Sequence, residues 1–445
     1  MKKELITMCF AALSGVSAWG AVTPNPLLSR GLPAYTSEGV NSYITDGDLT
    51  NWKQCTAKEI AFEVGEGPSR LFLTWESYGD CAWATDFTSN CSHSGTPYRN
   101  FKVYASANST DGTDGDWILS AEVKGNVVMS RGIFVPFEGM SWIRLVSEEE
   151  VGQLLEVEIF DASVAANDTW FFMGTSISQM GLKQQDTDST TAELIHARFP
   201  EYTPAMLRGG IGCINSTEVV SHLQDYLQYA GNVKYWAIEM GTNDAWGGGD
   251  WNVETFRKNM QTIIDAAKEH GIEPVIARII ATNEQVAGWQ VNPKFLDVID
   301  ELTEQNHLHP GPDFYTYFLN HPEQLASDGV HPNGQTLGGQ AMHHLWAEAL
   351  APIYAESIAQ ESGWIDSEEM RPVSPILSVE GSEIKLSHLP ANVKVELFDP
   401  SGVVVERFFV SNVDHVVLPS RLPAGLYVLL AKWEEGMISR QVVIR

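Results

Sequence analysis

Three short apolar runs in the middle of the chain, separated by stretches of helical length, most constrain its fold. The runs cover residues 170–173, 235–240 and 274–280, and each has the length and composition of a buried strand. Between the last two, apolar residues recur at helical spacing over residues 256–267, and Gly271 follows where a helix would end. Strands that alternate with helices predict a parallel sheet covered on both faces.

The two flanks of this region follow a different pattern, and a length of 445 residues leaves room for separate domains. Residues 21–165 contain short runs of alternating apolar and polar residues, divided by Gly, Asn, Asp and Ser clusters. Residues 376–445 repeat that pattern after a polar stretch at 359–375, which we interpret as a linker. We therefore predict a multidomain chain. An N-terminal β-sandwich of jelly-roll type and a small C-terminal β-sandwich flank a central α/β/α domain over residues 166–358.

The first 20 residues have the composition of a signal peptide. Lys2 and Lys3 precede an apolar segment at 5–16, and Ala18-Trp19-Gly20 offers small residues for cleavage. That segment is short for a membrane span, and no later stretch is apolar enough to cross a bilayer. We expect residues 1–20 to be removed and the protein to be secreted or held at the cell surface. A buried N-terminal strand is the alternative.

Export would place the remaining cysteines in an oxidising compartment, where disulfides form. Cys55, Cys81, Cys91 and Cys213 permit three pairings, and Cys81 and Cys91 are close enough in sequence to staple a loop. No two cysteines have a Cys-x-x-Cys spacing. We therefore predict no cysteine metal site, and we expect no cofactor.

The charge of the chain argues against one class of partner. There are 28 Lys and Arg against 57 Asp and Glu, which gives a formal net charge of −29. Such a charge repels the phosphates of nucleic acid and of anionic membranes. We therefore expect neither nucleic acid nor an anionic membrane as a partner. We expect the protein to act on neutral or cationic material.

Ser176 is the first candidate for a reactive group. It follows the apolar run at 170–173 in the segment Gly174-Thr175-Ser176. Open α/β sheets keep their reactive groups just past the carboxyl ends of parallel strands. A serine hydroxyl becomes a nucleophile only when a base takes its proton. Without such a base, a helix-capping role is the better interpretation.

The segment Asp328-Gly329-Val330-His331-Pro332 contains a suitable base. His331 could take the serine proton, while Asp328, three residues earlier, could fix the histidine tautomer and stabilise the imidazolium ion. A solvated turn is the alternative interpretation of this segment.

Two other segments could stabilise the negative charge that develops on a carbonyl oxygen. Asn243 follows the run at 235–240 within Gly241-Thr242-Asn243-Asp244, so its amide is expected at the same edge of the sheet as Ser176. Residues 209–212 are interpreted as a glycine-rich turn whose backbone N–H groups could point at the same charge. Each segment alone is an ordinary turn, but their order along one α/β region is hard to explain by turns.

In this order the segments resemble the sequence blocks of the SGNH (GDSL-like) hydrolase superfamily. Residues 172–177 resemble the first block, 241–244 the third and 328–332 the last, while the second is assigned to Gly212 with Gly210 as the competing choice. The resemblance implies a three-layer α/β/α fold and two-step ester hydrolysis. It implies a triad of Ser176, Asp328 and His331, and oxyanion donors at Ser176, Gly212 and Asn243.

The first block departs from the family pattern at one position. Thr175 replaces the aspartate that usually precedes the nucleophile. That aspartate neighbours the nucleophile and is not a member of the triad, so the resemblance still implies a complete triad. The segment also lacks the second glycine of a Gly-x-Ser-x-Gly elbow, which argues against a lipase-type α/β-hydrolase.

The flanking regions resemble two other kinds of domain. Asp46-Gly47-Asp48 with Trp52, and the run at 142–145, resemble discoidin-like galactose-binding sandwiches, which implies glycan binding. Residues 422–428 and 441–444 resemble the C-terminal sorting domain of type IX secretion, which implies a Bacteroidetes-like source and contact with its secretion machinery. An ordinary carbohydrate-binding or spacer sandwich is the alternative for the last region.

These features predict a secreted carboxylic ester hydrolase that removes O-acetyl groups from carbohydrate, such as acetylated plant cell-wall polysaccharide. Trp52, Trp75 and Trp83 could stack on sugar rings, with core packing as the alternative. A lipase or thioesterase is a second hypothesis, which requires an apolar acyl channel. A non-catalytic carbohydrate-binding protein is a third, and the intact Ser, Asn, Asp and His argue against it.

Overall fold

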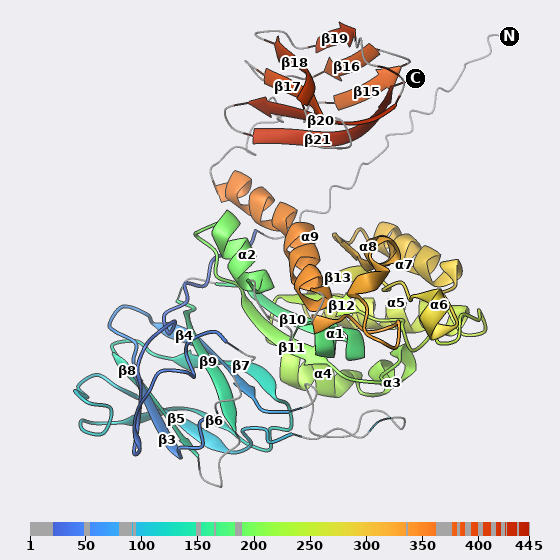
Figure 1. Ribbon diagram of the computed structural model, residues 1–445. Coiled ribbons are helices and arrows are strands. Elements are labelled where there is room, and N and C mark those ends of the chain that lie inside the picture. Colours follow the sequence, from blue (N-terminus) through green and yellow to red (C-terminus); the bar gives the residue numbers. More distant parts are fainter. Residues whose placement is uncertain are drawn as a thin grey trace, which may run out of the picture. The chain divides into compact units, whose positions relative to one another are not determined.

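The computed structural model describes most of the chain up to residue 361 and the strands beyond it (Figure 1). The described residues are 21–48, 54–79, 91, 95–147, 153–163, 166–182, 189–334, 337–361, 376–380, 383–387, 393–398, 404–410, 415–419, 423, 425–433 and 436–444. They belong to two compact units, residues 1–358 and 359–445. The predicted signal peptide, Trp52, Cys81, Trp83 and most of the predicted linker lie outside the described residues.

Two antiparallel sheets form the N-terminal part of the first unit. The larger has the strand order β2-β1-β3-β8-β5-β6 and the smaller β7-β4-β9. Alternate residues such as Leu71, Leu73 and Trp75 of β4 are buried in a core that both sheets share, because successive side chains of a strand point to opposite faces. Trp75 is therefore a core residue. The strands are β1 Ala34–Thr36, β2 Gly39–Asn41, β3 Glu59–Glu63, β4 Arg70–Ser77, β5 Phe101–Ser106, β6 Ile118–Val123, β7 Ser130–Pro136, β8 Trp142–Ser147 and β9 Leu154–Asp161.

A five-stranded parallel sheet follows, in the order β11-β10-β12-β13-β14. Its strands are β10 Thr169–Gly174, β11 Ala205–Gly210, β12 Tyr235–Glu239, β13 Glu273–Arg278 and β14 Pro310–Asp313. The three apolar runs of the sequence are β10, β12 and β13. Every residue of β10 and β12 is buried, as in a sheet that is covered on both faces. The predicted parallel sheet is confirmed.

Helices cover both faces of this sheet (Figure 1). Phe171 points into a hydrophobic cluster with residues of α3, α4, α5 and α7, whereas the next residue, Phe172, points into a second cluster with residues of α1, α2, α8 and α9. The helices are α1 Ser176–Gly181, α2 Thr191–Arg198, α3 Ser216–Ser221, α4 Leu223–Ala230, α5 Val253–Glu269, α6 Glu284–Ala287, α7 Pro293–Gln305, α8 Phe314–Asn320 and α9 Gly338–Glu361, with a 3-10 turn at Pro322–Gln324. Helix α5 is the amphipathic helix predicted from sequence, and Gly271 follows its end with a left-handed φ of 72°.

The glycine-rich segment at 209–212 differs from its sequence interpretation. Gly209 and Gly210 are the last two residues of β11, where they pair with Met173 and Gly174 of β10, and the turn begins only at Gly212. A Cβ atom at Gly210 would lie 2.3 Å from the backbone nitrogen of Gln179, so a glycine there lets α1 pack directly on the strand. Glycine was interpreted as a sign of a turn, but here it permits close packing.

Strand β11 is an edge of the parallel sheet, and the β7 strand of the N-terminal sheets covers it. The backbone N–H of Arg208 in β11 donates to the Ser130 hydroxyl at the start of β7 at 3.0 Å. The cluster around Phe171 also continues to Phe72 and Phe160 of the smaller sheet. This contact protects an edge that could otherwise pair with another chain.

The cysteines pair across the first unit. Cys91, from the segment between β4 and β5, forms a disulfide with Cys213, in the turn after β11, with a Cα–Cα distance of 6.0 Å. Cys91 therefore does not staple a loop with Cys81. Cys55 is buried and carries a free thiol.

The second unit contains two antiparallel sheets. Their strand orders are β15-β16-β19 and β18-β17-β20-β21, and Val395, Leu397 and Leu429 are buried. The strands are β15 Ile376–Glu380, β16 Glu383–Ser387, β17 Val393–Phe398, β18 Val404–Val410, β19 His415–Pro419, β20 Gly425–Trp433 and β21 Gly436–Ile444. Across both units, no helix among the described residues has the length and apolar character of a membrane span.

Candidate active site

The register of the parallel sheet brings three chain turns to one place. Gly174 at the end of β10 pairs with Gly210 of β11 on one side and with Glu239 of β12 on the other. The three strands therefore end at the same level, and the residues that follow them leave the sheet side by side. Ser176, Gly212 and Asn243 all come two to four residues after these strand ends.

Ser176 is the first residue of α1 and forms a hydrogen-bonded chain with two residues of a distant loop. Its Oγ lies 2.8 Å from Nε2 of His331, and Nδ1 of the same ring lies 2.6 Å from Oδ2 of Asp328. The histidine can accept the serine proton at Nε2 only if Nδ1 carries a proton, and the aspartate beside Nδ1 favours that tautomer. The three residues stand in the order that activates a serine hydroxyl.

The loop of Asp328 and His331 is held in shape by the aspartate itself. Oδ1 of Asp328 accepts the backbone N–H groups of Val330 and His331 at 2.9 and 3.1 Å. Partial burial alone would raise the pKa of Asp328, but the hydrogen bonds from Val330 and His331 and the charge of His331 lower it overall. The carboxyl is thus ionised over a wide pH range, as a partner of a protonated histidine requires.

The turn that carries Ser176 rests on a buried carboxyl group. Thr175 caps α1, since its Oγ1 accepts the Ile177 N–H at 3.2 Å. Its own N–H and hydroxyl donate to Oε2 of Glu239 at 3.2 and 3.0 Å, and the Ser178 hydroxyl reaches the same oxygen at 3.2 Å. Thr175 therefore joins the turn of Ser176 to the neighbouring strand, at the position where the resemblance leads one to expect an aspartate.

Glu239 is fully buried, and this has an electrostatic consequence. Burial raises the pKa of Glu239 to about 7, although the hydrogen bonds from Thr175 and Ser178 act in the opposite direction. Sequence analysis did not select this residue. A signal was present, because a glutamate within the apolar run at 235–240 is an unusual choice for a buried strand.

Close packing at Gly174 keeps α1 over the strand ends. A Cβ atom on Gly174 would lie 2.2 Å from Oγ and 2.5 Å from Cβ of Ser178. Any larger residue would therefore push α1, and Ser176 with it, away from the sheet. This gives a steric role to the glycine that begins the first block.

Asn243 lies half-buried in the turn after β12, at the same edge of the sheet. One N–H of its amide donates to the carbonyl of Ile214 at 2.7 Å, which fixes the side-chain orientation and leaves the second N–H of the group to other acceptors. The next residue, Asp244, accepts the backbone N–H and the hydroxyl of Ser216 at the start of α3. These bonds tie the turn of Asn243 to the turn after β11.

Gly212 lies buried in that turn after β11, directly before Cys213 of the disulfide. The turn is constrained on both sides, because Ile211 donates to the carbonyl of Gly174 at 3.0 Å and Cys213 has a left-handed φ of 63°. The structure thus brings the turns of Ser176, Gly212, Asn243 and His331 to one edge of the sheet. Among the residues that the structure describes, no group of three or more His, Cys, Asp or Glu side chains could hold a metal ion.

The site and its sheet define a class: a parallel α/β sheet covered by helices, with a serine, a histidine and a carboxylate hydrogen-bonded at the strand ends. No protein-family model and no curated protein matches the chain. Among solved structures it is similar to a lipase/acylhydrolase from Enterococcus faecalis, with 18% identity over 41% of this chain and 95% of that chain and a TM-score of 0.34.

Two further solved structures show likenesses of the same order. An acetylxylan esterase, Axe2, from Geobacillus stearothermophilus has 17% identity over 43% of this chain and 93% of that chain, with a TM-score of 0.32. The protein YxiM from Bacillus subtilis has 13% identity over 74% of this chain and 90% of that chain, with a TM-score of 0.38.

Proposed function

We propose that the protein is a serine-dependent carboxylic ester hydrolase. One observation carries the proposal, a continuous hydrogen-bonded chain of three side chains. His331 contacts Ser176 Oγ through Nε2 at 2.8 Å and Asp328 Oδ2 through Nδ1 at 2.6 Å. A helix-capping serine would not require this chain, and Thr175 already caps α1. The geometry therefore favours the nucleophile over the cap for Ser176.

In the proposed reaction, His331 takes the proton of Ser176 as its Oγ attacks the ester carbonyl. The C–O bond to the alcohol breaks when His331 returns that proton to the leaving oxygen, and water then releases the acyl group by the same steps in reverse. The backbone N–H groups of Ser176 and Gly212 and the Asn243 amide are the proposed donors to the oxyanion. Asp328 stabilises the imidazolium ion that forms in each step.

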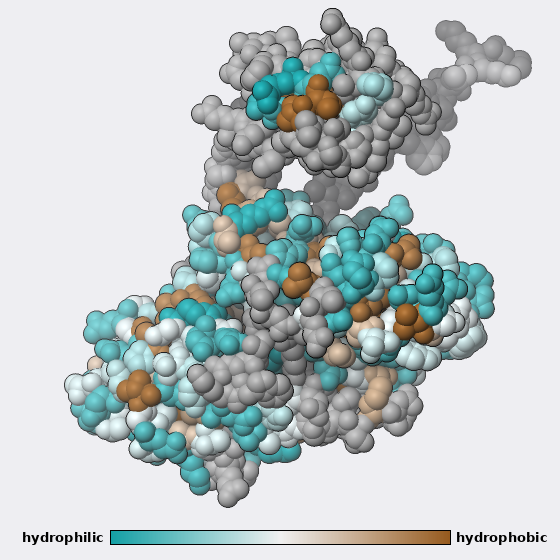
Figure 2. Space-filling view, in the orientation of Figure 1, coloured by the Kyte–Doolittle hydropathy of each residue, from teal (hydrophilic) through white to brown (hydrophobic). Residues whose placement is uncertain are grey.

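We propose that the substrate is an O-acetyl group on carbohydrate. Trp246 and Trp251 lie exposed in the loop that follows Asn243, and their flat faces offer surfaces on which sugar rings can stack beside the strand ends. On the face shown in Figure 2, hydrophobic residues of the described part form small separate patches, as expected for a protein that binds polar material. The sandwich-type flank at 21–165 and its resemblance to glycan-binding domains support the same substrate class.

We further propose export of the protein, with residues 1–20 as a signal peptide and residues 376–445 as a sorting domain. The resemblances at 422–428 and 441–444 support this assignment. Detection of the protein outside the cell, and its retention inside the cell when residues 376–445 are deleted, would test it.

Hydrolysis of p-nitrophenyl acetate by the wild type and by Ser176→Ala tests the proposed activity. We expect turnover by the wild type and a loss on the order of 10⁶ in kcat for the variant. Equal rates would contradict the proposal and favour a carbohydrate-binding protein. A preference for octanoyl over acetyl ester would instead favour a lipase, and acetate release from a panel of acetylated polysaccharides would identify the glycan.

A further inference from the structure

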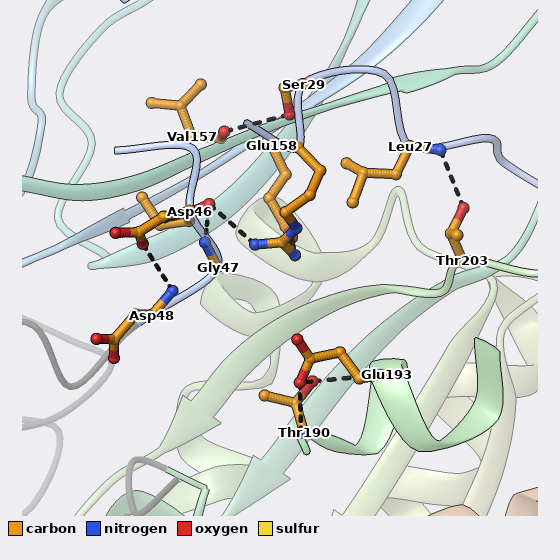
Figure 3. A network of polar contacts seen from close by, with 12 residues as sticks. Leu27, Ser29, Asp46, Gly47, Asp48, Val157, Glu158, Thr190, Glu193 and Thr203 are labelled. Atoms are coloured by element: carbon orange, nitrogen blue, oxygen red, sulfur yellow. Dashed lines mark hydrogen bonds and ion pairs between the residues drawn. The ribbon is translucent and has the colours of Figure 1, made fainter. Parts of the chain in front are cut away.

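A pocket lies within the first unit between the N-terminal sheets and the edge of the parallel sheet. Its volume is about 740 Å3 when the open space at its mouth is counted. Strands β4 and β9 and the loop at Gly47 line one side, and β11 and the start of α2 line the other. Figure 3 shows Gly47 and Glu158 on the first side and Thr190 and Glu193 on the second.

Arg208 supplies buried hydrogen-bond donors to this pocket. Its side chain projects from β11 and is 10% exposed, and it forms an ion pair with Glu76 of β4, which is 8% exposed. Nε and Nη1 of the guanidinium have no hydrogen-bond partner among the described residues. Buried donors without an acceptor cost free energy, so a group that accepts from both atoms would stabilise the pocket.

Glu156 supplies a second buried polar group. Its Oε1 accepts the Gly47 N–H at 3.0 Å and faces Arg30 at 3.5 Å, while its Oε2 is buried with no hydrogen-bond partner among the described residues. Burial, with the charge of Glu158 beside it, raises the pKa of Glu156 to about 9. At neutral pH this carboxyl therefore carries a proton, and its hydroxyl is a donor.

Guanidinium groups face the carboxyl groups of the pocket lining. Arg208 pairs with Glu76, while Arg30 lies 3.0 Å from Glu158 and 3.5 Å from Glu156. Burial raises the pKa of Glu158 as well as that of Glu156, so the lining holds little excess negative charge at neutral pH. The remaining lining includes the apolar side chains of Phe172 and Met206. Such a site favours an uncharged molecule that has several hydrogen-bond acceptors and one apolar face.

We propose that this pocket is a second ligand site, distinct from Ser176, and that it binds one uncharged sugar ring. The ring hydroxyls would accept from Arg208 and Glu156, and the C–H face would lie against the apolar lining. The ring could belong to a free monosaccharide or to a unit of a glycan chain, since both present the same groups. This inference does not depend on the nucleophilic role of Ser176.

Isothermal titration calorimetry on the full-length protein tests the proposal. The neutral ligands are methyl β-D-xyloside, methyl β-D-galactoside and methyl β-D-glucoside. Glucuronic acid and glucosamine are the charged comparators, and xylohexaose separates a chain unit from a free ring. We expect saturable binding of at least one neutral glycoside, binding unchanged in Ser176→Ala, and weaker binding of the charged sugars. Binding of the charged sugars alone, or of none of these sugars, would overturn the proposal.

Two leucine substitutions on the same helix test whether the ligand binds in the pocket. Ala192 lines the pocket from α2, whereas Ala197 of α2 is exposed and does not line it. Leucine is compatible with a helix at either position. We expect Ala192→Leu to fill the pocket and weaken binding at least about tenfold, as for other steric blocks of a small site, while Ala197→Leu binds like the wild type. Equal affinities in the two variants would place the sugar elsewhere.

Arg208→Lys tests whether Arg208 donates hydrogen bonds to the sugar, while it keeps a positive charge opposite Glu76. Lysine cannot present the two planar N–H groups of the guanidinium, so we expect weaker sugar binding. The thermal unfolding midpoint of the same preparation, compared with that of the wild type, reports whether the variant is folded. A folded Arg208→Lys variant with unchanged affinity would contradict the role of Arg208.

Discussion

Oε2 of Glu239 accepts hydrogen bonds from both the backbone N–H and the hydroxyl of Thr175, at 3.2 and 3.0 Å. This relationship joins β12 to the turn that carries Ser176. Because Thr175 also caps α1, the position of Ser176 depends on a buried carboxyl in another strand. Glu239 is therefore proposed as a positioning residue that does not contact the substrate.

Replacement of Glu239 by leucine is expected to impair both stability and turnover. Glu239→Leu leaves the donors of Thr175 and Ser178 without their acceptor, which should lower the free energy of unfolding by about 1–3 kcal/mol. We expect kcat for p-nitrophenyl acetate to fall with little change in KM, because Ser176 is displaced. Glu239→Gln keeps an oxygen acceptor and should retain most of the unfolding free energy and most of kcat. A similar loss of kcat and stability in the two variants would argue against this role.

The stability of the protein should depend on pH through the same carboxyl. The pKa of Glu239 is about 7 in the folded protein against an ordinary value of 4.5, so the native state binds more protons between these values. The contribution of this group to stability is then full below about pH 4.5 and is lost as the pH rises through about 7. Between pH 5 and 8, the free energy of unfolding measured in urea should fall more steeply with pH for the wild type than for Glu239→Gln. Parallel pH dependences of the two proteins would contradict the assignment.

The disulfide between Cys91 and Cys213 should stabilise both the fold and the turn of Gly212. It closes a loop with a sequence separation of 122 residues, and disulfides of this kind contribute about 2–4 kcal/mol. We expect the double variant Cys91→Ser, Cys213→Ser to lose about that much unfolding free energy, measured in urea. Dithiothreitol should destabilise the wild type and leave the double variant unchanged; an equal response of both would indicate that reduction acts elsewhere.

Substitution of Asn243 tests the proposed stabilisation of the oxyanion. Asn243→Ala is expected to lower kcat by about 10²–10³, as for the loss of one preorganised donor. Asn252 is a suitable control, because it lies nine residues further along and also donates its amide to a backbone carbonyl, that of Asp244. We expect Asn252→Ala to retain most of kcat, and full activity of Asn243→Ala would remove Asn243 from the site.

Much of the site could be predicted because its residues follow strand ends. A parallel sheet places the turns after β10, β11 and β12 at one edge, so Ser176, Gly212 and Asn243 come together once the strands are recognised. The hydrophobic pattern revealed β10 and β12 but not β11, since Arg208, Gly209 and Gly210 do not have the composition of a buried strand. Their places depend on tertiary contacts, with the Arg208–Glu76 pair as the clearest case.

Two other features depend on contacts between residues far apart in the chain. The pairing of Cys91 with Cys213 follows from the packing of the N-terminal sheets against β11, which no local pattern encodes. The support of Thr175 by Glu239 follows from the register of β10 and β12, which aligns Gly174 with Glu239. Sequence patterns therefore predicted strands β10, β12 and β13, helix α5 and the candidate triad, whereas β11 and the supporting contacts required the structure.

Covalent labelling with a serine-directed fluorophosphonate, followed by peptide mass spectrometry, tests the central claim most directly. The reagent reacts with a serine that a neighbouring base activates, so the wild type should acquire one adduct, on Ser176, with parallel loss of p-nitrophenyl acetate hydrolysis. His331→Ala should remain unlabelled under the same conditions. An adduct on a different serine, or no adduct in a protein that hydrolyses the ester, would contradict the assignment of Ser176 as the nucleophile.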